Sequence, residues 1–200
     1  MLKIGLTGSI AGGKSFVCDL LRELGCHVLD ADITAREVVA KGTRGLDAVI
    51  KAFGPDVLTE VGELDRAQLG SIVFADAEKR QLLNSIVHPL VTEAQDKWVR
   101  NVEMSDPDGI AVIDAALMIE SGGYRRFDKL IVVWCEPDIQ LRRLMARNNL
   151  DEIEARKRIA AQMSQHEKKR FADYLVDTSE GFEATRGQVE QLVEKLSQIN

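Results

Sequence analysis

The stretch Gly8-Ser9-Ile10-Ala11-Gly12-Gly13-Lys14-Ser15 decides the fold of this 200-residue chain. It fits the pattern G-x-x-x-x-G-K-[ST], whose two glycines, lysine and hydroxyl residue stand at fixed spacing. Apolar residues at 2–6 predict a strand before the stretch, and the amphipathic residues 14–24 predict a helix after it, which Gly25 ends. A strand, a glycine-rich turn and a helix in this order predict a phosphate-binding loop, or P-loop.

The residue types of the P-loop (residues 8–15) suit the binding of phosphate. Glycines let the backbone wrap closely and turn its N–H groups inward, so that they form an anion site at the helix N-terminus. Lys14 can reach the β- and γ-phosphates of a nucleotide, and the Ser15 hydroxyl can ligate Mg²⁺. The predicted nucleotide-binding residues are Gly8, Ser9, Ile10, Ala11, Gly12, Gly13, Lys14, Ser15 and Phe16.

Two aspartates favour a kinase among the P-loop proteins. A GTPase should carry an Asn-Lys-x-Asp motif after a later strand, and the sequence has none. Asp30 and Asp32 instead follow the second predicted strand, and the carboxyl ends of strands line the ligand crevice of an open α/β sheet. Asp32 is therefore our candidate for the base that accepts the proton of an attacking hydroxyl and helps to organise Mg²⁺. Alternatively, either aspartate caps the helix predicted from Ile33, and one can cap while the other is catalytic.

Strands alternate with helices along the chain, which predicts an α/β fold with a mostly parallel sheet covered by helices on both faces. The five predicted strands are residues 2–6, 27–29, 110–113, 129–135 and 174–176. Residues 33–100 are predicted to be helical nearly throughout, with breaks at 42–45, 54–55 and 61–62. Pro89 is expected in the first turn of a helix, where its missing N–H costs little. Further helices are predicted over residues 136–148, 151–170 and 182–197.

We predict a single domain, residues 1–200, with two regions added to the sheet and its helices. The helical region of about residues 33–105 is expected to form a lobe, and the strongly charged region of about residues 143–172 a lid. A lid that closes over both substrates would keep water from competing for the phosphoryl group. Most arginines and lysines of residues 156–170 are expected only to form a solvated helix face.

The composition is ordinary for a globular protein, so the function has to be inferred from a site. The net charge of −6 argues against a surface that coats nucleic acid. No apolar run approaches the length of a membrane helix, and the first residues do not continue as a signal peptide. Cys18, Cys26 and Cys135 have neither metal-like nor disulfide-framework spacing, so we expect reduced thiols in a cytoplasmic protein. We expect a monomer, with weak self-association as the alternative.

Further motifs are spread over nearly the whole chain, in a defined order and spacing. They are Ile4-Gly-Leu-Thr-Gly8, Asp30-Ala31-Asp32-x-x-Ala35-Arg36, Phe53-Gly54, Leu64-Asp65-Arg66-x-x-Leu69, Val73-Phe74, His88-Pro89, Asp114 to Glu120, Gln140-Leu-x-Arg143-x-x-x-Arg147, Arg158-Ile159-x-x-Gln162 and Ala172-Asp173. Together with the P-loop they resemble the dephospho-CoA kinase family, which performs the last step of coenzyme A synthesis.

The resemblance implies that ATP, with Mg²⁺, phosphorylates the ribose 3′-hydroxyl of dephospho-CoA to give CoA and ADP. It implies Asp32 as the base near that hydroxyl, and Arg36 and His88 in an acceptor pocket within the helical lobe. Arg143 and Arg147 would lie on the lid side, where a guanidinium can stabilise the transferring phosphoryl group. The predicted catalytic residues are thus Lys14, Asp32 and Arg143. The predicted substrate-binding residues are Asp32, Arg36, His88 and Asp114. Arg147 joins the predicted ATP-binding residues, and Ser15 is the predicted magnesium ligand.

Other interpretations of these residues stay open. His88 is alternatively a half-buried histidine at a helix start, and Arg36 a surface residue. The chain departs from the family pattern at Ala11-Gly12, at Phe16, and at Ala116 and Met118, and a turn at residues 177–179 also differs. The alternative functions are another P-loop nucleoside or nucleotide kinase and, in a different class, a nucleotide-dependent switch protein.

Overall fold

The computed structural model describes residues 1–199, and they divide into two compact units. The first unit is discontinuous and comprises Met1–Leu29 and Val102–Asn200, whereas the second is the continuous stretch Asp30–Asn101. None of the helices in the described part of the chain has the length and apolar character that crossing a membrane requires.

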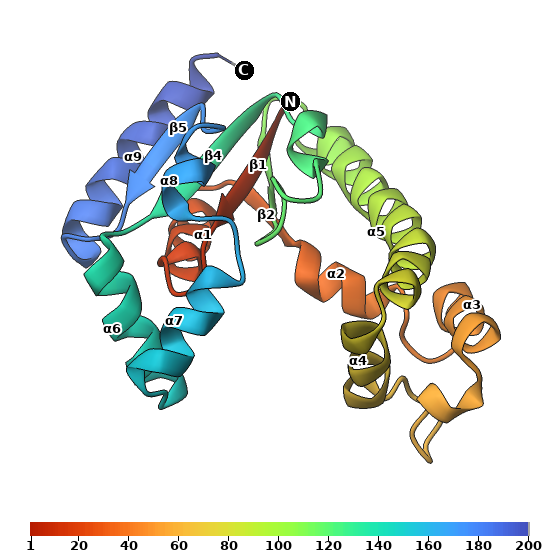
Figure 1. Ribbon diagram of the computed structural model, residues 1–200. Coiled ribbons are helices and arrows are strands. Elements are labelled where there is room, and N and C mark those ends of the chain that lie inside the picture. The colour runs from red at the N-terminus through yellow and green to blue at the C-terminus, as the bar shows by residue number, and fades with distance from the viewer. Residues whose placement is uncertain (200) are drawn as a thin grey trace. The chain divides into compact units, whose positions relative to one another are not determined.

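A five-stranded sheet forms the centre of the first unit (Figure 1). Its strands are β1 (Leu2–Gly8), β2 (His27–Asp30), β3 (Ile110–Asp114), β4 (Lys129–Trp134) and β5 (Tyr174–Asp177), in the spatial order β2-β3-β1-β4-β5. The pairs of β1 with β3, β1 with β4 and β4 with β5 are parallel, with Leu2 opposite Ile110 and Ile4 opposite Lys129. This confirms the predicted α/β fold with a mostly parallel sheet.

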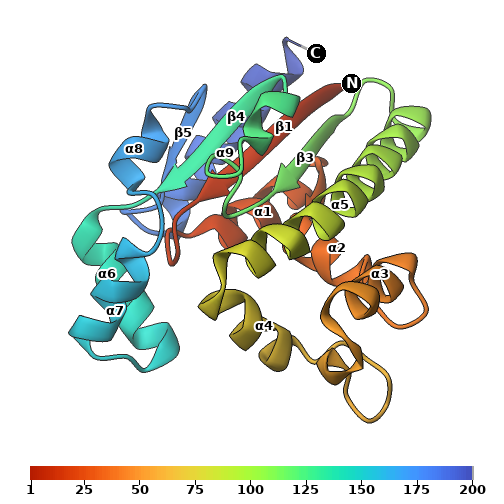
Figure 2. The ribbon, with the colours of Figure 1, turned by 45° about the vertical axis from the view of Figure 1, so that its right-hand side comes forward.

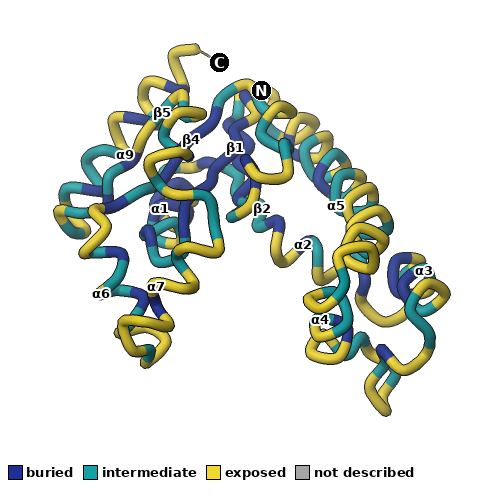
Figure 3. The backbone as a smooth tube through the Cα atoms, viewed as in Figure 1, coloured by how far each residue is buried: buried dark blue, intermediate teal, exposed yellow. Residues whose placement is uncertain are grey.

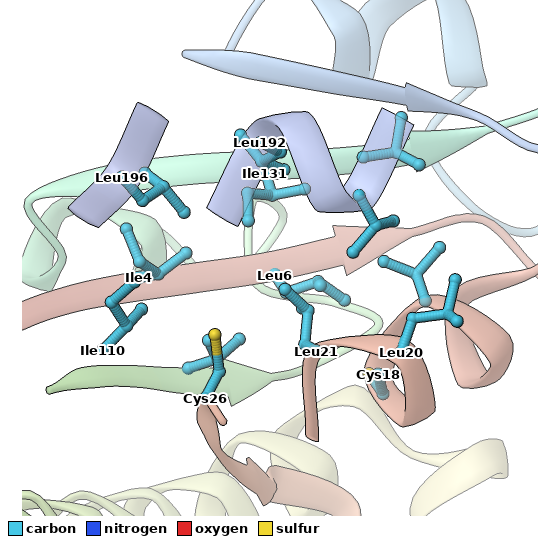
Figure 4. Packing of buried hydrophobic residues seen from close by; sticks show 14 of the residues in the cluster. Ile4, Leu6, Cys18, Leu20, Leu21, Cys26, Ile110, Ile131, Leu192 and Leu196 are labelled. Carbon is cyan, nitrogen blue, oxygen red and sulfur yellow. The ribbon is translucent and has the colours of Figure 1, made fainter. Parts of the chain in front are cut away.

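Helices α1 (Lys14–Glu23) and α9 (Phe182–Ser197) pack together behind this sheet in Figure 2. Alternate residues of β1 face these helices and meet the apolar positions of α1 and α9 in one core (Figure 4). Its fully buried members include Ile4, Leu6, Leu20, Leu21, Ile131 and Leu196. Each such side chain contributes about 1.5–3 kcal/mol by leaving water, so this core fixes the sheet on which the P-loop stands.

The opposite face of the sheet lies against the segment that follows β3. A side chain on Gly5 would come within 2.6 Å of the sulfur of Met118 and 2.9 Å of Phe127, so any larger residue there would force these side chains to shift. The Thr7 hydroxyl donates a hydrogen bond of 3.1 Å to the carbonyl of Ala116. The short 3₁₀ helix η2 (Gly123–Arg126) ends this segment before β4 begins.

Three helices connect β4 to β5. They are α6 (Pro137–Asn148), α7 (Glu152–Ala160) and α8 (Gln165–Lys169), and α6 contacts α7 while α8 contacts β4. The predicted helix over 151–170 is therefore interrupted at residues 161–164, where Ser164 forms a capping box with Glu167 and starts α8. Most residues of α7 are exposed, as Figure 3 shows in yellow.

The second unit is helical, as predicted. It contains α2 (Ala31–Glu37), α3 (Arg44–Phe53), the 3₁₀ helix η1 (Pro55–Val57) and α4 (Arg66–Ala75), and the long helix α5 (Ala77–Ser105) crosses into the first unit. Its own core contains Val39, Val49, Val57 and Leu69. The breaks that contain Gly42, Gly54 and Gly62 were predicted, whereas the break at Asp76, between α4 and α5, was not.

The predicted place of Pro89 is wrong, because Pro89 lies inside α5 and not in its first turn. A proline there removes one backbone hydrogen bond of the helix. The helix nevertheless continues, since Leu83, Ile86 and Val87 on the turns before the proline pack against the core of the second unit.

Candidate active site

The P-loop connects the end of β1 to the start of α1, and its backbone takes conformations that glycine favours. Gly13 caps α1 with φ 87°, and a side chain on Gly13 would come within 2.8 Å of the Thr178 hydroxyl. Ala11 has φ 57°, a region that a residue with a β-carbon enters at a cost of about 1–2 kcal/mol. The departure from the family pattern at Ala11 therefore puts a mildly strained residue in the loop.

Lys14 forms an ion pair with Asp114, the last residue of β3, and the Nζ atom donates to both carboxylate oxygens. Asp114 is buried, and the Cys18 thiol donates to its Oδ2 atom at 3.4 Å. Burial, with the negative charge of Asp114 as the next cause, raises the pKa of Cys18 to about 12, so this thiol stays protonated. Asp114 thus holds the side chain of Lys14 through this ion pair.

Arg143, on α6, binds Thr178 with both terminal nitrogens. Nη1 donates to the Thr178 hydroxyl at 2.8 Å and Nη2 to the Thr178 carbonyl at 2.7 Å. The same hydroxyl donates to the carbonyl of Gly12 at 3.0 Å. Arg143 therefore supports the P-loop through Thr178 in this structure. In the sequence, Thr178 stands out only as part of a turn that departs from the family pattern, and nothing there indicates this contact.

Two glutamines hold the backbone of Ile10 in the P-loop. Gln162 accepts a hydrogen bond from the Ile10 N–H at 2.9 Å, and Gln140 donates to the Ile10 carbonyl at 2.8 Å. Both glutamines stand in motifs of the family pattern, but no role for either could be predicted from the sequence. An uncharged amide carries no residue-type signal for a phosphate site, so only the contacts reveal them.

Lys168, on α8, is a charged side chain with no exposed surface. Its Nζ atom donates to the carbonyl of Ala116 at 2.8 Å and lies 3.0 Å from Glu120 Oε1. A buried ammonium is tolerated only where hydrogen bonds and an opposite charge replace water. Lys168 therefore anchors α8 to residues 116–120, the segment after Asp114.

The remaining ATP-binding candidates of the first unit differ in exposure: Gly8 and Ser9 are buried, Phe16 is half-buried, and two are exposed. Ser15 is exposed at the start of α1. Phe16 packs edge-on against Phe182, with ring centroids 4.8 Å apart. Arg147 is exposed near the end of α6 and donates from Nε to the side chain of Asn148 at 3.0 Å.

The second unit carries the acceptor-side candidates. Asp30 caps α2, because its Oδ1 atom accepts from the backbone N–H groups of Asp32 at 2.7 Å and Ile33 at 3.1 Å. Asp32 is exposed, and within residues 1–199 its carboxylate has no hydrogen bond or ion pair. Arg36 is exposed on α2, and His88 is exposed within α5 and not half-buried at a helix start. Asp30 is thus the cap, which leaves the Asp32 carboxylate available for chemistry.

The fold and the P-loop define the class of protein first. A parallel sheet with the P-loop after its central strand is the arrangement of a P-loop kinase. A shikimate kinase from Bacteroides thetaiotaomicron shares this fold, with a TM-score of 0.54 and 17% identity over 98% of each chain. A protein from Thermus thermophilus superposes with a TM-score of 0.85 at 29% identity, over 100% of this chain and 98% of that one.

Sequence comparison then gives the family. The profile of the dephospho-CoA kinase family matches residues 2–183. A dephospho-CoA kinase of Listeria innocua is 45% identical over 194 residues, which is 96% of each chain. One of Bacillus licheniformis is 44% identical over 198 residues, 99% of this chain and 98% of that one. The chain belongs to the dephospho-CoA kinase family and is a kinase, as the motifs indicated. The roles of its individual residues stay predictions.

Proposed function

We propose that this enzyme transfers the γ-phosphoryl group of ATP to the ribose 3′-hydroxyl of dephospho-CoA, with CoA and ADP as products. The observation that carries the proposal is the P-loop of residues 8–15, between strand and helix, in a chain whose residues 2–183 match the family. In-line transfer from a nucleotide needs positioning and charge stabilisation more than covalent chemistry, and the P-loop offers both.

The proposed roles follow from charge and hydrogen bonding. The N–H groups of the P-loop and Lys14 bind the phosphates, and Lys14 exchanges part of its contact with Asp114 for the γ-phosphate. Asp32 accepts the proton of the 3′-hydroxyl. Its carboxylate is exposed and has no hydrogen bond or ion pair within residues 1–199, which supports this role. Arg36 and His88 bind the acceptor. Arg143 stabilises the transferring group, a role that requires it to exchange its contacts with Thr178.

Mg²⁺ fits the oxygen donors beside the P-loop. Within residues 1–199 no cluster of three or more histidine, cysteine or carboxylate side chains could hold a metal ion on its own. Mg²⁺ suits such a place, because it keeps several waters and binds through one or two protein oxygens and substrate phosphates. The exposed Ser15 hydroxyl is the proposed ligand; Mg²⁺ would neutralise charge between the β- and γ-phosphates.

The proposal also covers the roles of two regions of the chain, the oligomeric state and the cellular location. Residues of about 33–105 would bind the acceptor and residues of about 143–172 would act as the lid within one functional domain, 1–200. A pocket within the second unit is lined by Val38, Arg44, Leu90, Glu93 and Lys97 among others and could take part of the acceptor. We propose a monomer in the cytoplasm, where ATP is abundant and the three free cysteines stay reduced.

ADP release with Mg-ATP tests the function, with dephospho-CoA, AMP, cytidine or no acceptor added. We expect stimulation by dephospho-CoA alone, with CoA as the product. Lys14→Ala should nearly abolish turnover and keep the fold, and Asp32→Asn should keep ATP binding and lose transfer. Stimulation by another acceptor would favour a different P-loop kinase, and no stimulation by any acceptor would favour a switch protein.

A further inference from the structure

The backbone of Ile10, the third residue of the P-loop, is held on both sides by side-chain amides. Gln162 Oε1 accepts from its N–H at 2.9 Å, and Gln140 Nε2 donates to its carbonyl at 2.8 Å. A third glutamine links to the second, because Gln165 Nε2 donates to Gln140 Oε1 at 2.8 Å. We call Gln140, Gln162 and Gln165 the glutamine clamp.

The glutamine clamp is itself fixed to the sheet. Gln165 bonds both backbone groups of Cys135, directly after β4: it accepts from the N–H at 3.0 Å and donates to the carbonyl at 3.0 Å. Gln140 is 3% exposed. Its Nε2 and Oε1 atoms are both hydrogen-bonded, so rotating this buried amide would break both bonds and leave polar groups unpaired. The clamp therefore sets the position of Ile10 relative to β4, the strand beside β1.

The places of these glutamines in the chain give the clamp its role. Gln140 lies on α6, Gln162 follows the end of α7, and Gln165 begins α8. They thus stand before and after α7, the exposed and charged helix of the proposed lid. A displacement of α7 would therefore move side chains that contact Ile10 of the P-loop.

We propose that Gln140 and Gln162 are positioning residues for the nucleotide, with Gln165 as the support of Gln140. They act through Ile10: with both of its backbone groups bonded, the neighbouring N–H groups of the P-loop stay turned toward the phosphates. The proposal rests on the proposed function only for the identity of the nucleotide. It assigns these glutamines no contact with the reacting atoms.

Replacement of Gln162 tests the clamp with little effect on packing. Methionine keeps the length of the half-buried Gln162 side chain and removes the acceptor. In Gln162→Met we expect the KM for ATP to rise about 3- to 10-fold, as the loss of one hydrogen bond implies, with kcat and the acceptor KM within about two-fold of the wild type. ADP affinity, measured by calorimetry on the full-length protein, should fall by the same factor. Because this binding needs no acceptor, it separates the clamp from the proposed reaction.

Gln140→Met and a matched control complete the experiment. Gln140→Met should weaken ADP binding similarly, and the double variant should lose less than the product of both effects, since both act on one backbone. Asp128→Leu removes a comparable side-chain bond, 2.8 Å to the N–H of Lys3, at the other end of β1. It should leave ADP affinity unchanged. An ADP affinity within two-fold of the wild type in both glutamine variants, or an equal loss in the control, would overturn the proposal.

Discussion

The ion pair between the buried Lys168 and the partly exposed Glu120 gives a stability prediction that can be worked out in advance. Lys168 has no exposed surface, whereas the Glu120 side chain is 23% exposed, with 3.0 Å between Nζ and Oε1. Removing one partner of a fully buried ion pair costs about 3–5 kcal/mol, because a charge then stays buried without compensation. Solvent reaches Glu120 and screens part of this effect, so for Glu120→Gln we expect a loss of about 2 kcal/mol in unfolding free energy.

Removing the lysine should cost less than removing its partner. In Lys168→Met the aliphatic stem stays packed, Glu120 turns to solvent, and the Ala116 carbonyl keeps the Thr7 hydroxyl as a donor. The substitution loses the hydrogen bonds of the ammonium, but it also removes the free-energy cost of burying that charge. These two effects largely cancel, so we expect a loss of about 1 kcal/mol in unfolding free energy. The double variant should be close to Lys168→Met alone, because no buried charge remains.

Urea unfolding of the four proteins measures this cycle. Tryptophan fluorescence in a Trp98→Phe background follows Trp134 at the end of β4, in the same unit as the ion pair. The expected coupling is about 2 kcal/mol, well above the about 0.5 kcal/mol within which independent sites add. Additive losses, or a Glu120→Gln variant no less stable than Lys168→Met, would refute the argument that burial of the ammonium sets the energetics.

Three further predictions concern the cap, the loop and a thiol. Asp30→Ala should lower the unfolding free energy by about 1 kcal/mol, whereas Asp30→Asn, which keeps the capping oxygen, should lose far less in thermal unfolding. Gly13→Ala should lose at least about 1–2 kcal/mol and most nucleotide affinity in calorimetry, because φ is 87° and Thr178 blocks the β-carbon; normal ADP binding would contradict this. Burial raises the pKa of Cys18 from 9.0 to about 12 in the folded protein, so its contribution to stability is complete below about pH 9 and is lost as the pH rises toward 12. Cys18→Ala should therefore lose less stability than the wild type between pH 9 and 11 in urea titrations, and equal losses would contradict the shift.

Much of the fold could be predicted because its signals are local. The P-loop pattern fixes β1 and α1, and the helix predicted over 182–197 agrees with α9 (Phe182–Ser197). Pro89 was placed wrongly for a physical reason: a proline disfavours a helix interior locally, yet tertiary packing of the neighbouring apolar side chains outweighs that cost. The break at 161–164 was missed because Ser164 and Glu167 form a capping box inside a charged stretch that otherwise suits a helix.

The candidate site likewise has one part that could be predicted from the sequence and one part that could not. Lys14 and Ser15 follow from a spacing rule that reflects phosphate geometry. The contacts that shape the loop come from Gln140, Gln162 and Thr178, which lie more than a hundred residues away in sequence. Such contacts form only when the strands and helices pack together, and neither the charge nor the hydrophobic periodicity of the sequence indicates them. The Asp30 cap was among the alternatives because Asp is a preferred cap, and the structure selects it.

The strand order also has a consequence for how this chain folds during its synthesis on the ribosome. β1 emerges first, but its two neighbours β3 and β4 begin only at Ile110 and Lys129. The continuous stretch Asp30–Asn101 is complete before either of them exists. The nascent protein thus carries an apolar strand with two open edges while its middle third can already fold, and such an edge favours misassociation. Cotranslational folding should therefore begin in the middle of the chain, and the phosphate-binding loop should take shape near the end of synthesis.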